Sequence, residues 1–445
     1  MKLLLTTLLL SVNILADVTL SDAWQKMQDS SAALSASKSD VNRAKLKESS
    51  SKAMYLPSLS FVGSYTHLSD VVSVDSSEIS DFMASLPVPI PFPSQIDVSN
   101  QDIFLADLQL LWPLYVGGKI DAARKIYKSK VVESQAIHEM KRDKAFLKLV
   151  KVYYGVVMSK SLYETRVEVQ KALQKHFLNA KKLKEQGQIA RVELLHAEVK
   201  LDEAKIETTK SKHQNDILKS ALKSMIKSSE SPLSKLFVYE YIKDEEYYKH
   251  QNQENSSILR VLDEKTSQSN SLVDIKKADW HPKLVAFGNY NLYRDDSPLM
   301  KMAPKWFGGI VLKFTLLDRK DRAQEIEITK LLNSKVKSLK VQAKEDLLLL
   351  VEKTYNEMLL YRDEYNSLNS SINLSKENYK LRTIAFNEGL GTSSDVIDAQ
   401  MLLAGAKTKR LNAAYNYVQK ISQLSVLSGN LESFFEILRV SEEIE

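Results

Sequence analysis

The sequence predicts a mainly α-helical fold in which long antiparallel helical hairpins are joined to four β-strands per chain. Three observations predict this fold. Glycine and proline, the usual helix breakers, number only 12 and 10 in 445 residues, and this scarcity favours long uninterrupted helices. Short segments alternate apolar and polar residues, which is the period of a strand with one apolar face. The same order of elements occurs twice along the chain.

The repeat divides the chain into two similar halves. Pro57 and Pro282 lie in matching segments and stand 225 positions apart. Farther along, Gly187 and Gly389 belong to a long stretch that matches at a constant offset of 202. Two unrelated helical regions would not keep one offset, so we expect a duplicated unit. The predicted repeats are 17–232 and 233–445, and the second carries an equatorial insertion and a C-terminal tail.

Each half is expected to contain a helix, two strands and a helical hairpin, in that order. The expected first helices are 20–52 and 255–278, the strands are 61–67, 104–112, 285–293 and 306–314, and the long helices are 119–185 and 321–387. At 1.5 Å per residue, each long helix would measure about 100 Å. A second helix follows Gly187 or Gly389 and returns along the first. The spacing of Val351, Tyr355 and Met358 is that of a coiled-coil seam.

The strands of one chain cannot close a barrel. In 104–112, Leu108 and Leu110 share one face, while Asp107 and Gln109 share the other. A segment of about nine residues is long enough for a tilted transmembrane strand. Because a bilayer does not tolerate open sheet edges, several chains would have to pool their strands. Three chains would give about twelve, enough to surround an aqueous channel.

The N-terminus and the composition exclude several classes of protein. Residues 1–16 have a positive start, an apolar stretch and a terminal small residue, the pattern of a signal peptide. The net charge of +6 is spread without a basic block, so nucleic-acid binding is not expected. The chain has no cysteine, which rules out thiolate metal sites and cysteine nucleophiles.

No enzyme signature is present. Glu193 and His196 have the Glu-x-x-His spacing of helix-bundle di-iron sites. Such a site needs a second pair of this kind, and the repeat has Asp395 and Asp398 instead. Gly389-Leu-Gly391 has no preceding strand, so it is not a nucleotide-binding loop. We therefore expect no catalytic residue, no metal and no cofactor.

The sequence resembles the TolC-like family of outer-membrane efflux and secretion ducts over essentially the whole predicted mature chain. The resemblance is carried by Trp112-Pro-Leu-Tyr-Val-Gly-Gly-Lys119, weakly mirrored by Leu316-Leu-Asp-Arg319, and by the hairpin turns at 185–195 and 387–399. It implies a homotrimer with a transmembrane, twelve-stranded barrel in outer-membrane lipid, four strands coming from each chain. It also implies an α-barrel that extends into the periplasm as a tunnel.

The function implied by the resemblance is that of an exit duct. Such a duct serves a tripartite efflux pump or a type I secretion system and exports small molecules or proteins. Its expected partners are a periplasmic adaptor protein and an inner-membrane transporter. The cargo (drug, metal or protein) stays open. The alternative is a soluble periplasmic coiled-coil scaffold that bridges envelope proteins, which explains the hairpins but not the strands.

The resemblance assigns a periplasmic gate to residues after the second turn. The acidic residues that narrow such ducts correspond to Asp395 and Asp398, with Glu193 in the equivalent layer of the first half. Three chains would stack two rings of carboxylates, a cation-selective constriction. Phe386 and Gly391 fall where the family can carry polar locking contacts, which neither side chain can make. The alternative is an ordinary helix start with Ser393 or Ser394 as N-cap.

The two turns resemble the tips that contact an adaptor in this family. They read Gln186-Gly187-Gln188 and Glu388-Gly389-Leu390. The glycines also suit the left-handed backbone that a helical hairpin requires. Both interpretations are compatible.

Overall fold

A computed structural model describes residues 17–319 and 321–444, which form two compact units. Within the described residues, the first unit contains 17–41, 133–263 and 339–444, and the second contains 42–132, 264–319 and 321–338. Both units combine segments from the two sequence halves, so the repeat boundaries at 17–232 and 233–445 stay a prediction. The predicted signal peptide, 1–16, lies outside the described residues.

The predicted helices and strands are present in the predicted order. The helices are α1 (Leu20–Ser30), α2 (Ala32–Ser51), α3 (Ser77–Ala84), α4 (Lys119–Glu185), α5 (Arg191–Ile226), α6 (Glu245–Asn255), α7 (Ser257–Lys277), α8 (Pro298–Met302), α9 (Arg322–Asn387), α10 (Ser393–Leu427) and α11 (Leu431–Ile444). The strands are β1 (Asp17–Val18), β2 (Ser58–His67), β3 (Ser73–Asp75), β4 (Gln95–Asp97), β5 (Asp102–Tyr115), β6 (Ser231–Pro232), β7 (Lys283–Arg294) and β8 (Trp306–Lys313).

The first helix of the first half differs from the predicted 20–52, because it is interrupted at Ser31. In the second half, α7 matches the predicted 255–278, and Ser256 separates it from the additional helix α6. Ser31 and Ser256 both leave the helical conformation, with ψ values of 109° and 119°. The Ser31 hydroxyl accepts a hydrogen bond from the backbone N–H of Leu34 at 3.3 Å, and Ser256 does the same for Leu259 at 3.4 Å. A serine side chain that caps the following turn lets the chain end one helix and begin another. The two serines stand 225 positions apart, which is the offset of the repeat in this part of the chain, so the break occurs at equivalent positions in both halves.

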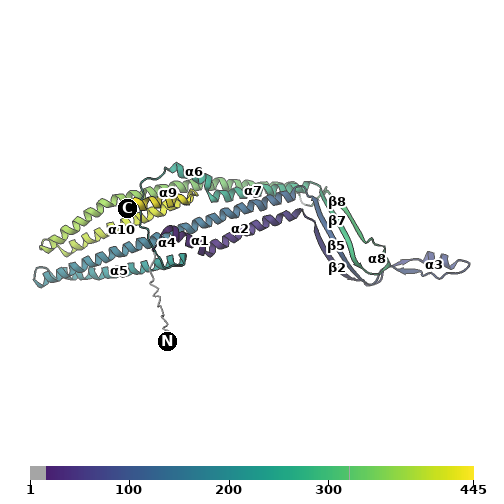
Figure 1. The fold of residues 1–445 in the computed structure, drawn as a ribbon, viewed down its shortest axis with the longest axis horizontal. Helices are drawn as coiled ribbons and strands as arrows, with labels where there is room; N and C mark the ends of the chain where they lie inside the picture. The colour runs from purple at the N-terminus through teal and green to yellow at the C-terminus, as the bar shows by residue number, and fades with distance from the viewer. Residues whose placement is uncertain (1–16, 320, 445) are drawn as a thin grey trace, which may run out of the picture. The chain divides into compact units, whose positions relative to one another are not determined.

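The second unit contains a four-stranded antiparallel sheet in the order β2-β5-β7-β8 (Figure 1). Strand β5 is longer than predicted and includes Pro113, next to which its register with β7 shifts. A proline has no N–H to give to the ladder, so an irregularity at this point is expected. Large apolar side chains of the edge strands are uncovered, with Phe61 of β2 65% and Ile310 of β8 64% exposed. In the described chain, each edge strand is paired in this sheet on one side only.

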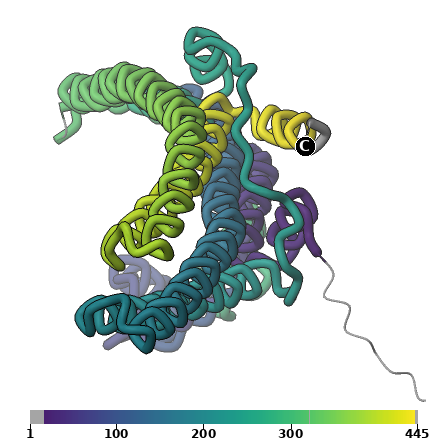
Figure 2. The backbone as a smooth tube through the Cα atoms, turned by 90° about the vertical axis from the view of Figure 1, so that its left-hand side faces the viewer, coloured from purple at the N-terminus to yellow at the C-terminus, as the bar shows by residue number. Residues whose placement is uncertain are grey.

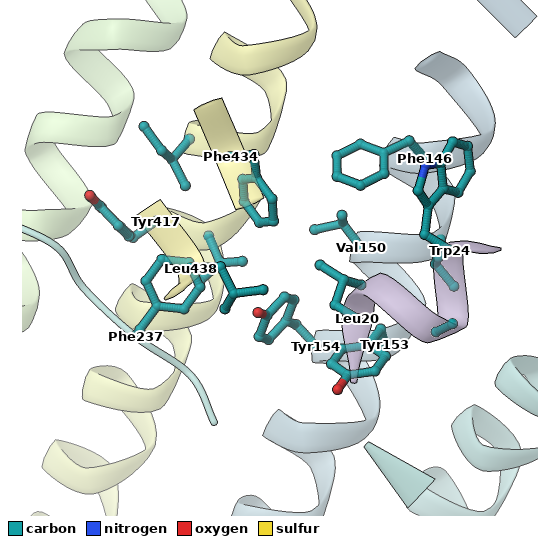
Figure 3. Packing of buried hydrophobic residues seen from close by; sticks show 14 of the residues in the cluster. Leu20, Trp24, Phe146, Val150, Tyr153, Tyr154, Phe237, Tyr417, Phe434 and Leu438 are labelled. Atoms are coloured by element: carbon teal, nitrogen blue, oxygen red, sulfur yellow. The ribbon is translucent and has the colours of Figure 1, made fainter. Parts of the chain in front are cut away.

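The first unit contains the main hydrophobic core. The ring of Phe146 on α4 meets Trp24 of α1 and Phe434 of α11 edge-on, with centroids 5.3 Å and 5.6 Å apart. The Tyr153 hydroxyl donates to the backbone carbonyl of Val18 at 2.8 Å, which holds β1 against α4. Figure 3 shows these rings packed together with Tyr417 of α10. This core joins helices from both sequence halves.

The hairpins α4–α5 and α9–α10 each turn back at a short loop (Figure 2). Within 17–319 and 321–444, no helix has the length and apolarity needed to cross a membrane.

Candidate functional site

The two hairpin turns have the same backbone structure. Gly187 and Gly389 both have φ of 74°, and a Cβ at either position would meet nothing within 4 Å. The bonds are Gly187 N–H to Lys184 O (3.0 Å), Gln188 N–H to Leu183 O (2.9 Å), Gly389 N–H to Phe386 O (3.1 Å) and Leu390 N–H to Ala385 O (2.8 Å). This is the Schellman arrangement, which ends a helix with a left-handed residue. The need for glycine at the turns is thereby confirmed.

The predicted tip residues are all exposed: Gln186, Gly187, Gln188, Glu388, Gly389 and Leu390. Leu390 is 84% exposed, although its side chain is apolar. The glycines themselves are explained by the backbone, because the turn conformation and not crowding requires them.

Helix α10 begins at a different residue from the one expected. Its N-cap is Thr392, whereas the sequence had suggested Ser393 or Ser394. The Thr392 hydroxyl accepts from the N–H of Asp395 at 3.2 Å, and Asp395 Oδ2 accepts from the N–H of Thr392 at 3.0 Å. This reciprocal capping box satisfies two N–H groups that would otherwise lack partners, so it determines where the helix starts.

The corresponding helix of the first half cannot build this box. Its N-cap is Ala190, which stands 202 positions before Thr392 and has no side-chain oxygen. Glu193, the counterpart of Asp395, is therefore not used to cap its own helix. Its Oε2 accepts instead from the backbone N–H of Ser393 at 2.7 Å. A carboxylate from α5 thus stabilises the N-terminus of α10, where the helix dipole favours negative charge.

Ser393 is held by a second contact from the other hairpin. Its hydroxyl lies 2.7 Å from Nε2 of His176 on α4, and the Ser393 side chain is fully buried. We call Ser393, Glu193 and His176 the hairpin clasp, because together they join α4 and α5 to α10. Burial lowers the pKa of His176 to about 4, an effect that the nearby Glu193 opposes and His196 reinforces. The imidazole is therefore neutral at pH 7.

Phe386 lies inside the paired hairpins. Its ring is 4.6 Å from that of His176, centroid to centroid, and it packs in a small apolar cluster with Ala180, Ala197 and Val396. Its side chain is buried in the single chain. Phe386 therefore supports the clasp by excluding water from the His176 ring.

Asp395 and Asp398 are one helical turn apart and more accessible. Asp395 is half-buried, and Arg382 of α9 lies 3.6 Å from its carboxylate. Hydrogen bonds from Thr392, first from its backbone N–H and then from its hydroxyl, lower the pKa of Asp395, and Arg382 adds to the effect. Asp398 is exposed, and its Oδ2 accepts from the Ser394 hydroxyl at 3.3 Å. Asp395 is thus a fixed negative charge at neutral pH.

Sequence reasoning did not find His176 or Arg382, and it named Ser393 only as a candidate N-cap. The three come from helices whose contacts depend on how two hairpins pack, and the sequence shows no spacing that links them. One usable signal was the mismatch between Ala190 and Thr392 at equivalent positions, which leaves Glu193 free to bond elsewhere.

The described residues contain no group of three or more His, Asp or Glu side chains placed to hold a metal ion.

A family model described as outer membrane efflux protein matches residues 23–226 and 250–430, most of the chain. This chain belongs to the outer membrane efflux protein family. The protein is thus an outer-membrane efflux channel that extends into the periplasm, and it is not an enzyme. The channel interpretation is confirmed over the alternative of a soluble scaffold.

Solved structures of other channels share this fold at low sequence identity. CusC matches with a TM-score of 0.76 and 10% identity, over 94% of this chain and 93% of that chain. CmeC of Campylobacter jejuni matches with 0.73 and 15%, over 94% and 89%, and the open state of MtrE of Neisseria gonorrhoeae with 0.73 and 13%, over 94% and 90%. No curated protein sequence matches the efflux protein. The predicted fold of long helical hairpins joined to four strands is confirmed.

Proposed function

We propose that three copies of this chain assemble into the exit duct of a tripartite efflux pump or a type I secretion system. The observation that carries the proposal is the open sheet, with edge strands β2 and β8 and uncovered apolar residues. Within a bilayer, unpaired edges are not tolerated. Pairing β2 of one copy with β8 of the next removes every edge and produces a twelve-stranded barrel from three four-stranded sheets.

Cysteine cross-linking tests this assembly, because the chain has no cysteine of its own. Ser60→Cys on β2 is combined with a single cysteine moved along β8 from Trp306 to Lys313. Oxidation should produce covalent dimers and trimers at alternate β8 positions. The same β8 series combined with Leu105→Cys on the inner strand β5 is the control and should stay monomeric. A wild-type particle with the mass of a monomer in mild detergent would contradict the proposal.

Within the duct, Asp395 and Asp398 are proposed to form the periplasmic gate. Three copies would present two stacked rings of carboxylates, which attract cations and repel anions. Glu193 and Phe386 act indirectly, since Glu193 bonds to the first residue of α10 and Phe386 packs beneath it. The gate is tested by single-channel recording of Asp395→Asn/Asp398→Asn protein in a planar bilayer. Reduced cation selectivity and weaker block by divalent cations are expected.

The control for the gate is Asp202→Asn, which removes an exposed carboxylate from α5 that pairs with Lys205. It should leave selectivity unchanged. If the double variant has the selectivity and divalent block of the wild type, these two residues do not form the constriction.

The exposed turns 186–188 and 388–390 are proposed to contact a periplasmic adaptor, which in turn would bind an inner-membrane transporter. Support comes from Leu390, whose apolar side chain is exposed at a tip. Replacing it by Arg should weaken co-purification with the adaptor from cross-linked cells while leaving the assembled duct intact. Leu349→Arg, at an exposed position within α9 away from the tip, is the matched control. Equal adaptor recovery with both variants would rule out the tip contact at this residue.

A further inference from the structure

A mainly apolar cavity of about 260 Å³ lies within the first unit. It is bounded by α4, by the junction between α6 and α7, by α9 and by the end of α10. Its apolar lining consists of Met140, Leu147, Ile258, Leu347, Val426 and Leu427. The junction is the Ser256 break described above, so part of the cavity wall is the point where α6 ends and α7 begins. It is far along the sequence from the turns and from the clasp.

One polar side chain in the cavity wall is buried and incompletely bonded. Asn252 is only 1% exposed, and its Nδ2 donates to the backbone carbonyl of Leu427 at 2.6 Å. Its Oδ1 accepts no hydrogen bond from any described residue. A buried acceptor without a partner is destabilising, so this part of the wall is held together at a cost.

A carboxyl group lines the same cavity. Asp143 on α4 is partly buried, and burial raises its pKa to about 6, although the neighbouring Arg142 acts in the opposite direction. No hydrogen bond or ion pair to its carboxylate is present among the described residues. An unpaired carboxyl group and a buried amide residue therefore line a space whose other walls are mostly apolar.

The ligand that fits these walls has three properties. It must donate hydrogen bonds, because the free carboxylate of Asp143 is an acceptor. It must carry a positive charge, because an ionised carboxylate in an apolar setting is stabilised by a cation. It must also have an apolar body for the surrounding Leu, Ile, Val and Met side chains. Small anions are disfavoured by Asp143, although Lys144 and the start of α7 at Ser257 would attract them.

We propose that this cavity binds a small amphiphilic ammonium compound, with its ammonium group against the Asp143 carboxylate and its apolar part against Leu147 and Leu347. The proposal does not depend on the trimer or on the gate, since every residue of the cavity belongs to the first unit of one chain.

Calorimetric titration of the purified full-length protein in detergent tests the site. The probe is 2-phenylethylammonium, with neutral 2-phenylethanol and anionic 3-phenylpropionate as comparison ligands of similar size. Empty detergent micelles supply the background. The wild type should bind the ammonium saturably and prefer it to both other ligands. Asp143→Asn should weaken that binding by about tenfold, which corresponds to the loss of one charge-assisted hydrogen bond. Asp202→Asn is the charge-matched control and should bind as the wild type does.

The pH dependence gives a second readout. Affinity should rise between pH 5 and pH 7.5 as Asp143 ionises, and this rise should vanish in Asp143→Asn. The charged groups beside Asp143 are Arg142 and Lys144 of its own helix, whereas α6, α7, α9 and α10 contribute no titratable residue to the cavity wall. Leu347→Phe, which fills part of the space, should also reduce binding.

Three outcomes would overturn the proposal. They are the absence of saturable binding at millimolar probe, equal affinity in wild type and Asp143→Asn, and preference for 3-phenylpropionate. The last would assign the cavity to anions held by Lys144 and the start of α7.

Discussion

The imidazole Nε2 of His176 lies 2.7 Å from the hydroxyl of Ser393, a residue 217 positions later in the chain. Ser393 is also the residue whose backbone N–H bonds to Glu193 at 2.7 Å. One serine thus receives a contact from each helix of the first hairpin. Because Asp395 and Asp398 follow on the same helix, the clasp determines where the two acidic side chains stand. Loss of the clasp should affect both stability and the closed state of the channel.

Ser393→Ala should lower the free energy of unfolding by about 1–2 kcal/mol, because it leaves the buried His176 without its partner. It should also raise the fraction of time that the channel conducts in a bilayer. Both effects are measured on one preparation, by thermal unfolding and by single-channel recording. The matched control is Ser394→Ala, whose hydroxyl makes only a long bond to Asp398. Similar stability losses in the two variants would show that the Ser393 hydroxyl contributes no more to the free energy of unfolding than that of Ser394.

Acid should destabilise the protein through His176. Burial lowers its folded pKa to about 4, below the ordinary value of 6.5. The unfolded chain therefore binds more protons between these values, and stability is lost as the pH falls from about 6.5 towards 4. The loss attributable to His176 between pH 7 and pH 5 is about 2 kcal/mol. His176→Asn should reduce the pH dependence of the melting temperature, whereas His213→Asn, at an exposed position, should not.

Removing the N-cap of α10 should lower the stability of the protein. Thr392→Ala deletes the hydroxyl that accepts from Asp395 N–H, and N-cap losses of this kind cost about 1 kcal/mol. The control is Thr209→Ala in the middle of α5, where the hydroxyl bonds only to the Lys205 carbonyl one turn before. Alanine has the higher helix propensity there, so no loss is expected. A melting temperature of Thr392→Ala equal to that of the wild type would contradict the capping role.

The turn glycines should respond to alanine in the opposite way from a helical glycine. Gly389→Ala places a Cβ at φ of 74°, which costs about 1–2 kcal/mol although no atom lies nearby. Gly405→Ala, within α10 and equally uncrowded, should stabilise by about 0.5–1 kcal/mol. Chemical denaturation of both variants measures the difference. A loss of stability in Gly405→Ala would reveal a packing role for that residue.

Prediction from sequence succeeded where the signal is local. The long helices, the alternating strands and the glycine turns each follow from a period or a backbone requirement that neighbouring residues express. It failed at Ser31, because a serine within a helical pattern can cap a new helix or remain inside the old one, and tertiary packing selects between them. It also placed the start of α10 one or two residues late, since three consecutive hydroxyl residues, Thr392 to Ser394, compete for the N-cap.

The sequence by itself determined the order of the elements, the duplication and the positions of both turns. These depend on periodicity and on φ preferences, which act over a few residues. Only the tertiary structure decided that Glu193 bonds to Ser393 and that Asp143 and Asn252 line one cavity. Such contacts join residues whose separation along the chain carries no information about their distance in space. They arise when apolar faces pack and leave particular polar groups to find partners, or to remain without one.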